Sequence, residues 1–179
     1  MIRSFRAVVD AGALLALLAG CGLFTEEPTP SCPRAKILSD ARTVQLYRDG
    51  EGRDPTDVKY EVAITSLTGE CEYDFDDGRS TITAVFTLGI EARRGPAGDS
   101  DTLDVPYFVA VVDPERNIRA KQIFRPTLVF AASGIRTGTL EEVEQVIPVA
   151  TGFAGPDYEI FVGLQLDRDQ LDEQLKQKR

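Results

Sequence analysis

The chain has 179 residues, with 29 acidic against 20 basic side chains, no histidine and a formal net charge of −9. This length suits one ordinary domain. The acidic balance disfavours nucleic acid and anionic lipid surfaces as partners, and the missing histidine removes the commonest general base and metal ligand.

Residues 1–20 have the plan of a secretory signal peptide. Arg3 and Arg6 make the start of the chain positive, an apolar run follows, and the small pair Ala19-Gly20 precedes Cys21. The run is shorter than the roughly 20 apolar residues of a membrane-spanning helix, and Asp10 lies where such a helix tolerates charge least. We therefore predict an exported chain whose leader is removed before Cys21.

The end of this leader, Leu18-Ala19-Gly20-Cys21, resembles the lipobox of bacterial lipoproteins. In that family the cysteine thiol takes a diacylglycerol, the leader is cleaved before it, and the new amino terminus is usually acylated. Several acyl chains anchor a protein stably, whereas one holds it marginally. The resemblance implies lipidation of Cys21. Because Gly22 stands where an aspartate would signal inner-membrane retention, it also implies the Gram-negative outer membrane, with the domain facing the periplasm.

Once Cys21 is lipidated, Cys32 and Cys71 are left as an even pair, which in an exported protein predicts one disulfide. Loop-closure entropy for this separation gives about 4 kcal/mol as an upper figure. The alternatives are two buried free thiols and a metal pair. A metal site with two cysteines and no histidine is disfavoured.

Residues 21–34 are polar, punctuated by prolines and without periodicity, which predicts a flexible tether with a reach of roughly 30 Å. A single domain is expected at 35–179. Within it, alternating runs at 58–65, 71–75 and 80–92 predict strands, and the turn pair Asp77-Gly78 predicts a hairpin of the last two. The predicted inward residues of the first and third runs are Val58, Tyr60, Val62, Ile64, Ile82, Ala84, Phe86, Leu88 and Ile90.

The rest of the chain continues the alternation. Pro106 indicates an edge, an end or a bulge in a strand at 102–113, and Pro126 breaks a strand pair or a bent strand at 118–130. The segment 139–149 fits both a helix and a strand, and the strand is favoured. A further strand is predicted at 157–166, followed by a short terminal helix.

About seven short strands separated by turns predict a mainly β fold, an immunoglobulin-like or fibronectin-like β-sandwich with a short C-terminal helix. A β-barrel is the alternative. Tyr158, two residues before the inward Ile160 on a late strand, resembles the tyrosine corner of immunoglobulin-like domains, although no tryptophan accompanies it.

Candidate sites are few. Asp74, Asp76 and Asp77 supply hard oxygen ligands at a turn and are weak calcium candidates, but their spacing departs from the EF-hand loop and a solvated turn is favoured. No other metal site, no cofactor and no catalytic residue is predicted. Phe108, Phe124 and Phe161 form either a second buried face, which is favoured, or an exposed apolar patch that marks a partner surface.

The expected function is a lipid-anchored envelope protein of non-catalytic type that binds a protein partner or scaffolds an envelope assembly. One alternative is a module that binds a small ligand or calcium. The other is an enzyme without histidine, which is disfavoured because the commonest general base is missing.

Overall fold

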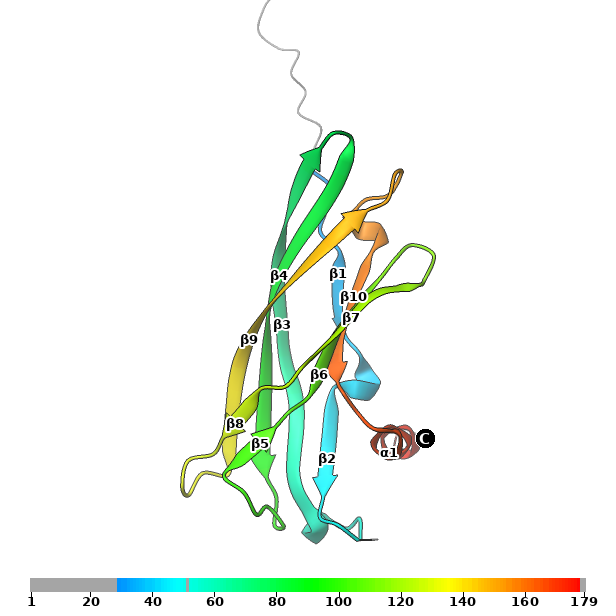
Figure 1. Cartoon of the computed structure of the whole chain (residues 1–179). Coiled ribbons are helices and arrows are strands. Elements are labelled where there is room, and N and C mark those ends of the chain that lie inside the picture. The colour runs from blue at the N-terminus through cyan, green and yellow to red at the C-terminus, as the bar shows by residue number, and fades with distance from the viewer. Residues whose placement is uncertain (1–28, 51, 178–179) are drawn as a thin grey trace, which may run out of the picture.

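The computed structural model describes residues 29–50 and 52–177, most of which form strands (Figure 1). One four-stranded sheet, sheet A, has the order β1-β10-β6-β7, and a second, sheet B, has the order β2-β3-β4-β9. The leader and Cys21 lie outside the described residues. In the described part of the chain, no helix is long and apolar enough to cross a membrane.

The described residues form ten strands, more than the roughly seven that the sequence predicts, and the predicted β-sandwich and terminal helix are confirmed. Sheet A contains β1 (Arg34–Ile37), β10 (Glu159–Leu164), β6 (Tyr107–Val112) and β7 (Ile118–Phe124). Sheet B contains β2 (Thr43–Tyr47), β3 (Val58–Asp76), β4 (Arg79–Arg94) and β9 (Arg136–Val149). The remaining elements are β5 (Thr102–Asp104), β8 (Thr127–Val129), three short 3-10 turns (Ser39–Ala41, Pro55–Asp57 and Gly155–Asp157) and α1 (Arg168–Gln177).

Strand β3 is continuous where the sequence predicts two separate runs. A register shift between Ile64 and Ser66 inserts Thr65 as a bulge, so the inward phase changes from even to odd residue numbers. Gly89 lies opposite the bulge. A Cβ there would lie 2.4 Å from Ser66 Oγ and 2.9 Å from Thr65 Oγ1, so glycine lets β4 approach the two hydroxyl side chains of the bulge.

The core lies between the two sheets, and every inward residue predicted for the first and third runs is buried there. The hairpin of β3 and β4 turns at Asp77 and Gly78, the residue pair that the sequence predicts for this turn. Their φ values of 45° and 75° lie in the left-handed region, as such a turn requires. The ambiguous segment 139–149 belongs to strand β9, as favoured.

The connectivity is immunoglobulin-like. After β4 the chain crosses from sheet B to sheet A, where β6 and β7 form a hairpin. It then returns to sheet B as β9, which pairs with β4, and crosses again to sheet A as β10, which pairs with β6. Tyr158 stands just before β10 and its hydroxyl accepts a hydrogen bond from the backbone N–H of Ala150 at 2.9 Å. This is the geometry of a tyrosine corner, so the weak sequence resemblance is supported.

Strand β1 occupies the place beside β10 that the last strand takes in an immunoglobulin sandwich, but it runs parallel to β10. The chain then switches sheets through Ser39–Ala41 and continues as β2 along β3. The first strand therefore completes sheet A, and the chain enters the domain next to its last strand.

The buried hydroxyl of Tyr107 gives a first testable prediction. It has no hydrogen-bond partner among the described residues, and burial, helped by Glu141, raises the pKa of Tyr107 to about 12. An unsatisfied buried group costs about 1–3 kcal/mol, so Tyr107→Phe is expected to raise the free energy of unfolding by about 1 kcal/mol in urea titrations.

Tyr60→Phe is the matched control, because the Tyr60 hydroxyl donates to the carbonyl of Ser100 and accepts from its N–H, both at 2.8 Å. Its removal is expected to cost about 1–2 kcal/mol. Equal losses in the two variants would show that the Tyr107 hydroxyl has a hydrogen-bond partner.

Candidate functional site

The solvent side of sheet A, here called face A, collects residues from four strands that are distant in the sequence. Residues that are paired across neighbouring strands point to the same side of the sheet. The strand register therefore groups the residues of face A into rows that run across the strands. One row is Lys36, Phe161, Ala110 and Lys121; a second is Gly163, Phe108 and Ile123; a third is Arg34, Glu159, Val112 and Ile118.

Two of the three phenylalanines singled out in the sequence lie on face A. Phe108 packs across Gly163, where a Cβ would lie 3.0 Å from the ring, so the glycine lets this ring lie close to β10. Phe124 instead points inward, where it is partly buried against the core and stacks on Tyr107 with ring centroids 5.0 Å apart. The favoured interpretation, a second buried face, therefore fits Phe124, whereas Phe108 and Phe161 are half-buried on the solvent side of sheet A.

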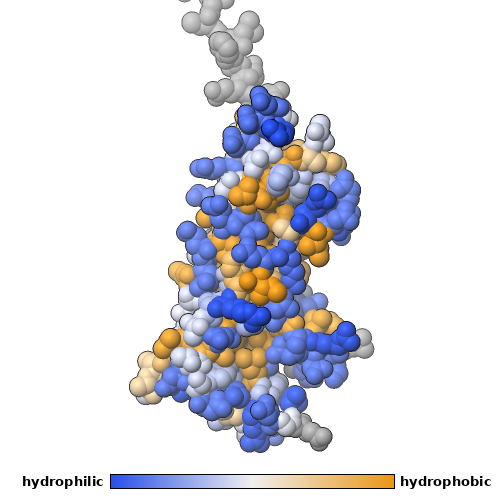
Figure 2. All heavy atoms as spheres, in the orientation of Figure 1, coloured by the Kyte–Doolittle hydropathy of each residue, from blue (hydrophilic) through white to orange (hydrophobic). Residues whose placement is uncertain are grey.

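Cations cover the two rings of face A. Lys121 Nζ lies 4.4 Å from the centroid of Phe108, and Lys36 Nζ lies 6.0 Å from that of Phe161. Next to them, Ile118 and Ile123 are 64% and 46% exposed. Face A thus combines exposed apolar side chains with lysines, in a chain that is acidic as a whole. In the view of Figure 2, hydrophobic patches lie among hydrophilic side chains on the surface of the domain.

One carboxylate forms ion pairs with three cations at this face. Glu159 accepts a 2.5 Å hydrogen bond from Lys36 and lies 3.7 Å from Arg34 and 3.8 Å from Arg116. The hydrogen bond from Lys36 is the largest cause that holds the pKa of Glu159 below its usual range. Since Arg34 and Lys36 belong to β1 and Glu159 to β10, these ion pairs also fasten β1 to the sheet.

The pH dependence of this fastening can be tested with Glu159→Gln. A carboxyl whose pKa is lower in the folded state stabilises the fold above its unfolded pKa, about 4.3, and loses that contribution as the pH falls through the lowered value. The variant is therefore expected to melt below the wild type at pH 7 and together with it near pH 2. Glu142→Gln, which removes a carboxylate without an ion pair in the described structure, should show no such convergence.

The solvent side of sheet B, here called face B, is acidic in the half next to the β3–β4 hairpin, whereas the row of Glu61, Arg93 and Arg136 in the other half mixes both signs of charge. Its rows include Glu70, Val85 and Glu144; Glu72, Thr83 and Val146; Asp74, Thr81 and Pro148; and Thr68, Thr87 and Glu142. The five carboxylates of these rows have no cationic partner in the described part of the chain. Leu140 and Val146 on this face are 72% and 59% exposed.

The calcium candidates Asp74, Asp76 and Asp77 are not brought together. Asp74 points outward on face B, Asp76 ends β3, and Asp77 forms the turn. Among the described residues, no three acidic, cysteine or histidine side chains lie close enough to hold a metal ion.

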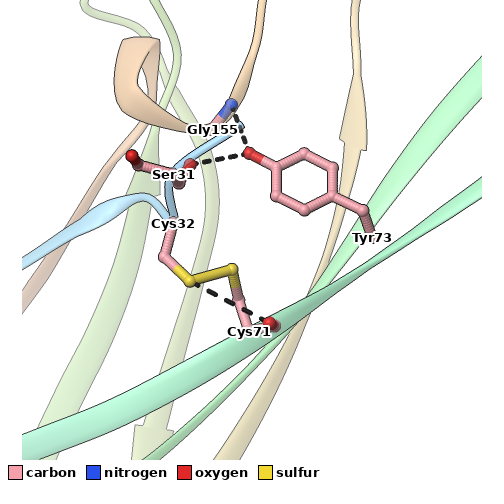
Figure 3. The surroundings of a disulfide bond; sticks show 5 residues. All are labelled: Ser31, Cys32, Cys71, Tyr73 and Gly155. Atoms are coloured by element: carbon pink, nitrogen blue, oxygen red, sulfur yellow. Dashed lines mark hydrogen bonds between the residues drawn. A yellow bond between two sulfur atoms is a disulfide. The ribbon is translucent and has the colours of Figure 1, made fainter. Parts of the chain in front are cut away.

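A clamp fastens the start of the domain to β3 and to the loop before β10 (Figure 3). The predicted disulfide between Cys32 and Cys71 is present, and the Tyr73 hydroxyl donates to the carbonyl of Ser31 at 2.7 Å and accepts from the N–H of Gly155 at 2.9 Å. A Cβ on Gly155 would overlap this hydroxyl, so the junction requires glycine. The fixed part of the chain therefore begins a few residues before the predicted boundary at 35.

A groove of about 690 Å³ runs between β2 and α1. Arg48 and Arg53 line one side, and Asp169 and Asp172 of α1 line the other. Opposite charges on the two sides of a groove attract one another, and together they do not form a binding site for a ligand of one charge sign. The groove is best explained by the helix lying beside the open edge of β2, which it helps to protect.

No protein-family model, no curated protein and no solved structure matches the chain. What the protein does is therefore inferred from faces A and B, the clamp and the sequence of the leader.

Proposed function

We propose that this chain is a lipid-anchored, non-catalytic protein of the cell envelope in which face A binds a protein partner. The observation that carries the binding role is the combination of exposed Ile118 and Ile123 with lysine-covered phenylalanine rings on one sheet face. Exposed apolar side chains gathered on one face mark interaction sites, and aromatic and arginine side chains dominate binding energy there.

The anchoring role is supported by Leu18-Ala19-Gly20-Cys21, which carries the lipobox resemblance and lies outside the described residues. The clamp fits this role. In Figure 1 the described chain starts beside the tip of the β3–β4 hairpin, at one end of the long axis of the domain. A force on the lipid anchor would be transmitted along the chain to Cys32 before it reaches β1. The disulfide would transmit this force to β3 of sheet B.

The anchor is tested by fractionating cells that express Cys21→Ser. The wild type is expected in the membrane fraction, released by detergent, and the variant in the aqueous envelope fraction. Gly22→Ser, which keeps the cysteine, should remain in the membrane fraction. A Cys21→Ser protein that stays with the membrane contradicts the anchor.

The binding face is tested by isolating the full-length protein from membranes with its stoichiometric partner. Ile118→Ser combined with Ile123→Ser is expected to lose that partner, because it removes the exposed apolar side chains of face A. Val129→Ser on β8 is the control, since Val129 is also 64% exposed but belongs to neither sheet A nor sheet B. Unchanged recovery with the face A variant contradicts the assignment.

A further inference from the structure

We propose that the partner of face A is face B of a second copy of this chain, so that anchored copies stack side by side. This inference rests on the proposed function and names the partner of the same surface. Its basis is the separation of charge within the molecule: face A presents more cations than carboxylates to solvent, and the half of face B next to the β3–β4 hairpin presents carboxylates.

Neither set of charges is neutralised within one copy. On face A, Arg34, Lys36 and, from the turn between β6 and β7, Arg116 share the single carboxylate of Glu159, and Lys121 lies over the ring of Phe108. On face B, the carboxylates have no cation within ion-pair distance among the described residues: Glu70, Glu72, Asp74, Glu142 and Glu144. Complementary potentials of this kind fix both the choice of partner and its register.

The exposed apolar side chains also match in position. Those of face A, Ile118 and Ile123, belong to the edge strand β7, and those of face B, Leu140 and Val146, belong to the edge strand β9. A groove of about 480 Å³ lined by residues of both strands shows that β7 and β9 lie on the same side of the sandwich. A copy translated perpendicular to the sheets therefore places its β7 side over the β9 side of its neighbour.

A translation also suits anchored molecules, because it leaves every tether pointing the same way. Such a contact is heterologous, and it produces an open row of copies rather than a closed dimer. With packed sheets about 10 Å apart, the repeat along the row is about 20 Å.

An anionic lipid surface fits face A less well than a second copy. The tip of the β3–β4 hairpin, beside the entry of the tether, carries Asp74, Asp76 and Asp77, which repel anionic lipids (Figure 1). The net charge of −9 opposes association at long range. At physiological salt, however, screening over about 8 Å leaves the charges on the touching faces to decide the interaction.

The contact is expected to be weak in free solution. Four strands at about 4.8 Å spacing, over roughly six residues, cover about 400 Å², which is less than the roughly 800 Å² per partner of a stable interface. Anchoring to one membrane raises the effective concentration of the copies, as a linker between two binding modules does. Rows should therefore form on membranes and dissociate in dilute solution.

The test is a charge swap between the two faces, with full-length lipidated protein in phosphatidylcholine vesicles and a zero-length cross-linker. One variant, Arg116→Glu with Lys121→Glu, makes the β7 side of face A acidic. The other, Glu142→Lys with Glu144→Lys, makes the β9 side of face B basic. All four positions are exposed strand or turn residues, so both variants should stay folded, with only a small loss of stability where Arg116 no longer pairs with Glu159.

The wild type is expected to give a ladder of cross-linked dimers, trimers and higher species. Each variant alone should lose at least tenfold in dimer, because the β7 side of its face A and the β9 side of its face B then carry the same sign. An equal mixture of the two variants should restore the ladder, since the acidic β7 side of one copy meets the basic β9 side of the other.

Wild-type protein that stays monomeric on vesicles overturns the inference, and so does a ladder that neither variant changes. If the rows are absent while Ile118→Ser with Ile123→Ser still costs the chain its stoichiometric envelope partner, the proposed function stands and only this inference falls. Binding of the Cys21→Ser protein to anionic vesicles, abolished by the face A reversal, would assign face A to lipid and also overturn it.

Discussion

Replacing Cys32 and Cys71 together by alanine is expected to lower the free energy of unfolding by about 2–4 kcal/mol. The disulfide closes a loop with a sequence separation of 39, and its removal returns that conformational freedom to the unfolded chain, for which the entropic upper figure is about 4 kcal/mol. In the native state, β1 would then be held by the ion pairs of Glu159 and by a pairing of only four residues.

The measurement is urea unfolding of the mature domain in its oxidised form, beside the alanine pair. Wild type reduced with a thiol should match the alanine variant, which separates loss of the bond from loss of the sulfur atoms. An unchanged midpoint in the alanine pair, or two free thiols found by mass spectrometry of the native protein, would contradict the role given to the clamp.

The second large effect is expected at Phe86. This side chain is 2% exposed on the inward side of β4 and lies in the core between the sheets, so Phe86→Ala should cost about 3–5 kcal/mol. Its neighbour Val85 points outward on face B, where Val85→Ala should cost less than about 1 kcal/mol.

This pair tests the phase of the central hairpin. Gly69 lies opposite Phe86, and a Cβ there would be 2.7 Å from Phe86 Cβ, so the ring and the partner strand approach closely at this point. Equal losses from Phe86→Ala and Val85→Ala in chemical unfolding would mean that the inward and outward faces of β4 are wrongly assigned.

Local features of the fold could be predicted because they depend on neighbouring residues. The inward residues of β4 follow from strict alternation, the hairpin turn from the Asp77-Gly78 pair, and the disulfide from an even cysteine count. The bulge at Thr65 was missed, although the change of phase between Ile64 and Cys71 was visible. Two runs out of phase by one residue indicate either two strands or one strand with a bulge, and periodicity cannot separate them.

Faces A and B could not be predicted, because they depend on strand order. Lys36 and Lys121 share a row with Phe161 only because β1 pairs with β10 and β6 lies between β10 and β7. The sequence indicated that three phenylalanines fall outside the main core phase, but it could not place Phe124 inside. Parallel pairing of the first strand with the last one is a long-range contact without a local signal.

Membrane anchorage, the binding role of face A and the stacking of copies are predictions. The other two depend on the anchorage. Lipid on Cys21 would hold the copies in one plane with a common orientation, which is the arrangement that weak contacts between faces A and B require. Face A would then act in an assembly rather than in free solution.

The direct measurement is the mass of the amino-terminal peptide of the protein purified from native membranes. A peptide that begins at Cys21 and carries a thioether-linked diacylglycerol, with or without a further acyl chain on the amine, is the predicted result. An unmodified terminus at Met1, or a mature terminus whose cysteine is a free thiol, would contradict lipid anchorage and remove the basis for the envelope location and the anchored rows.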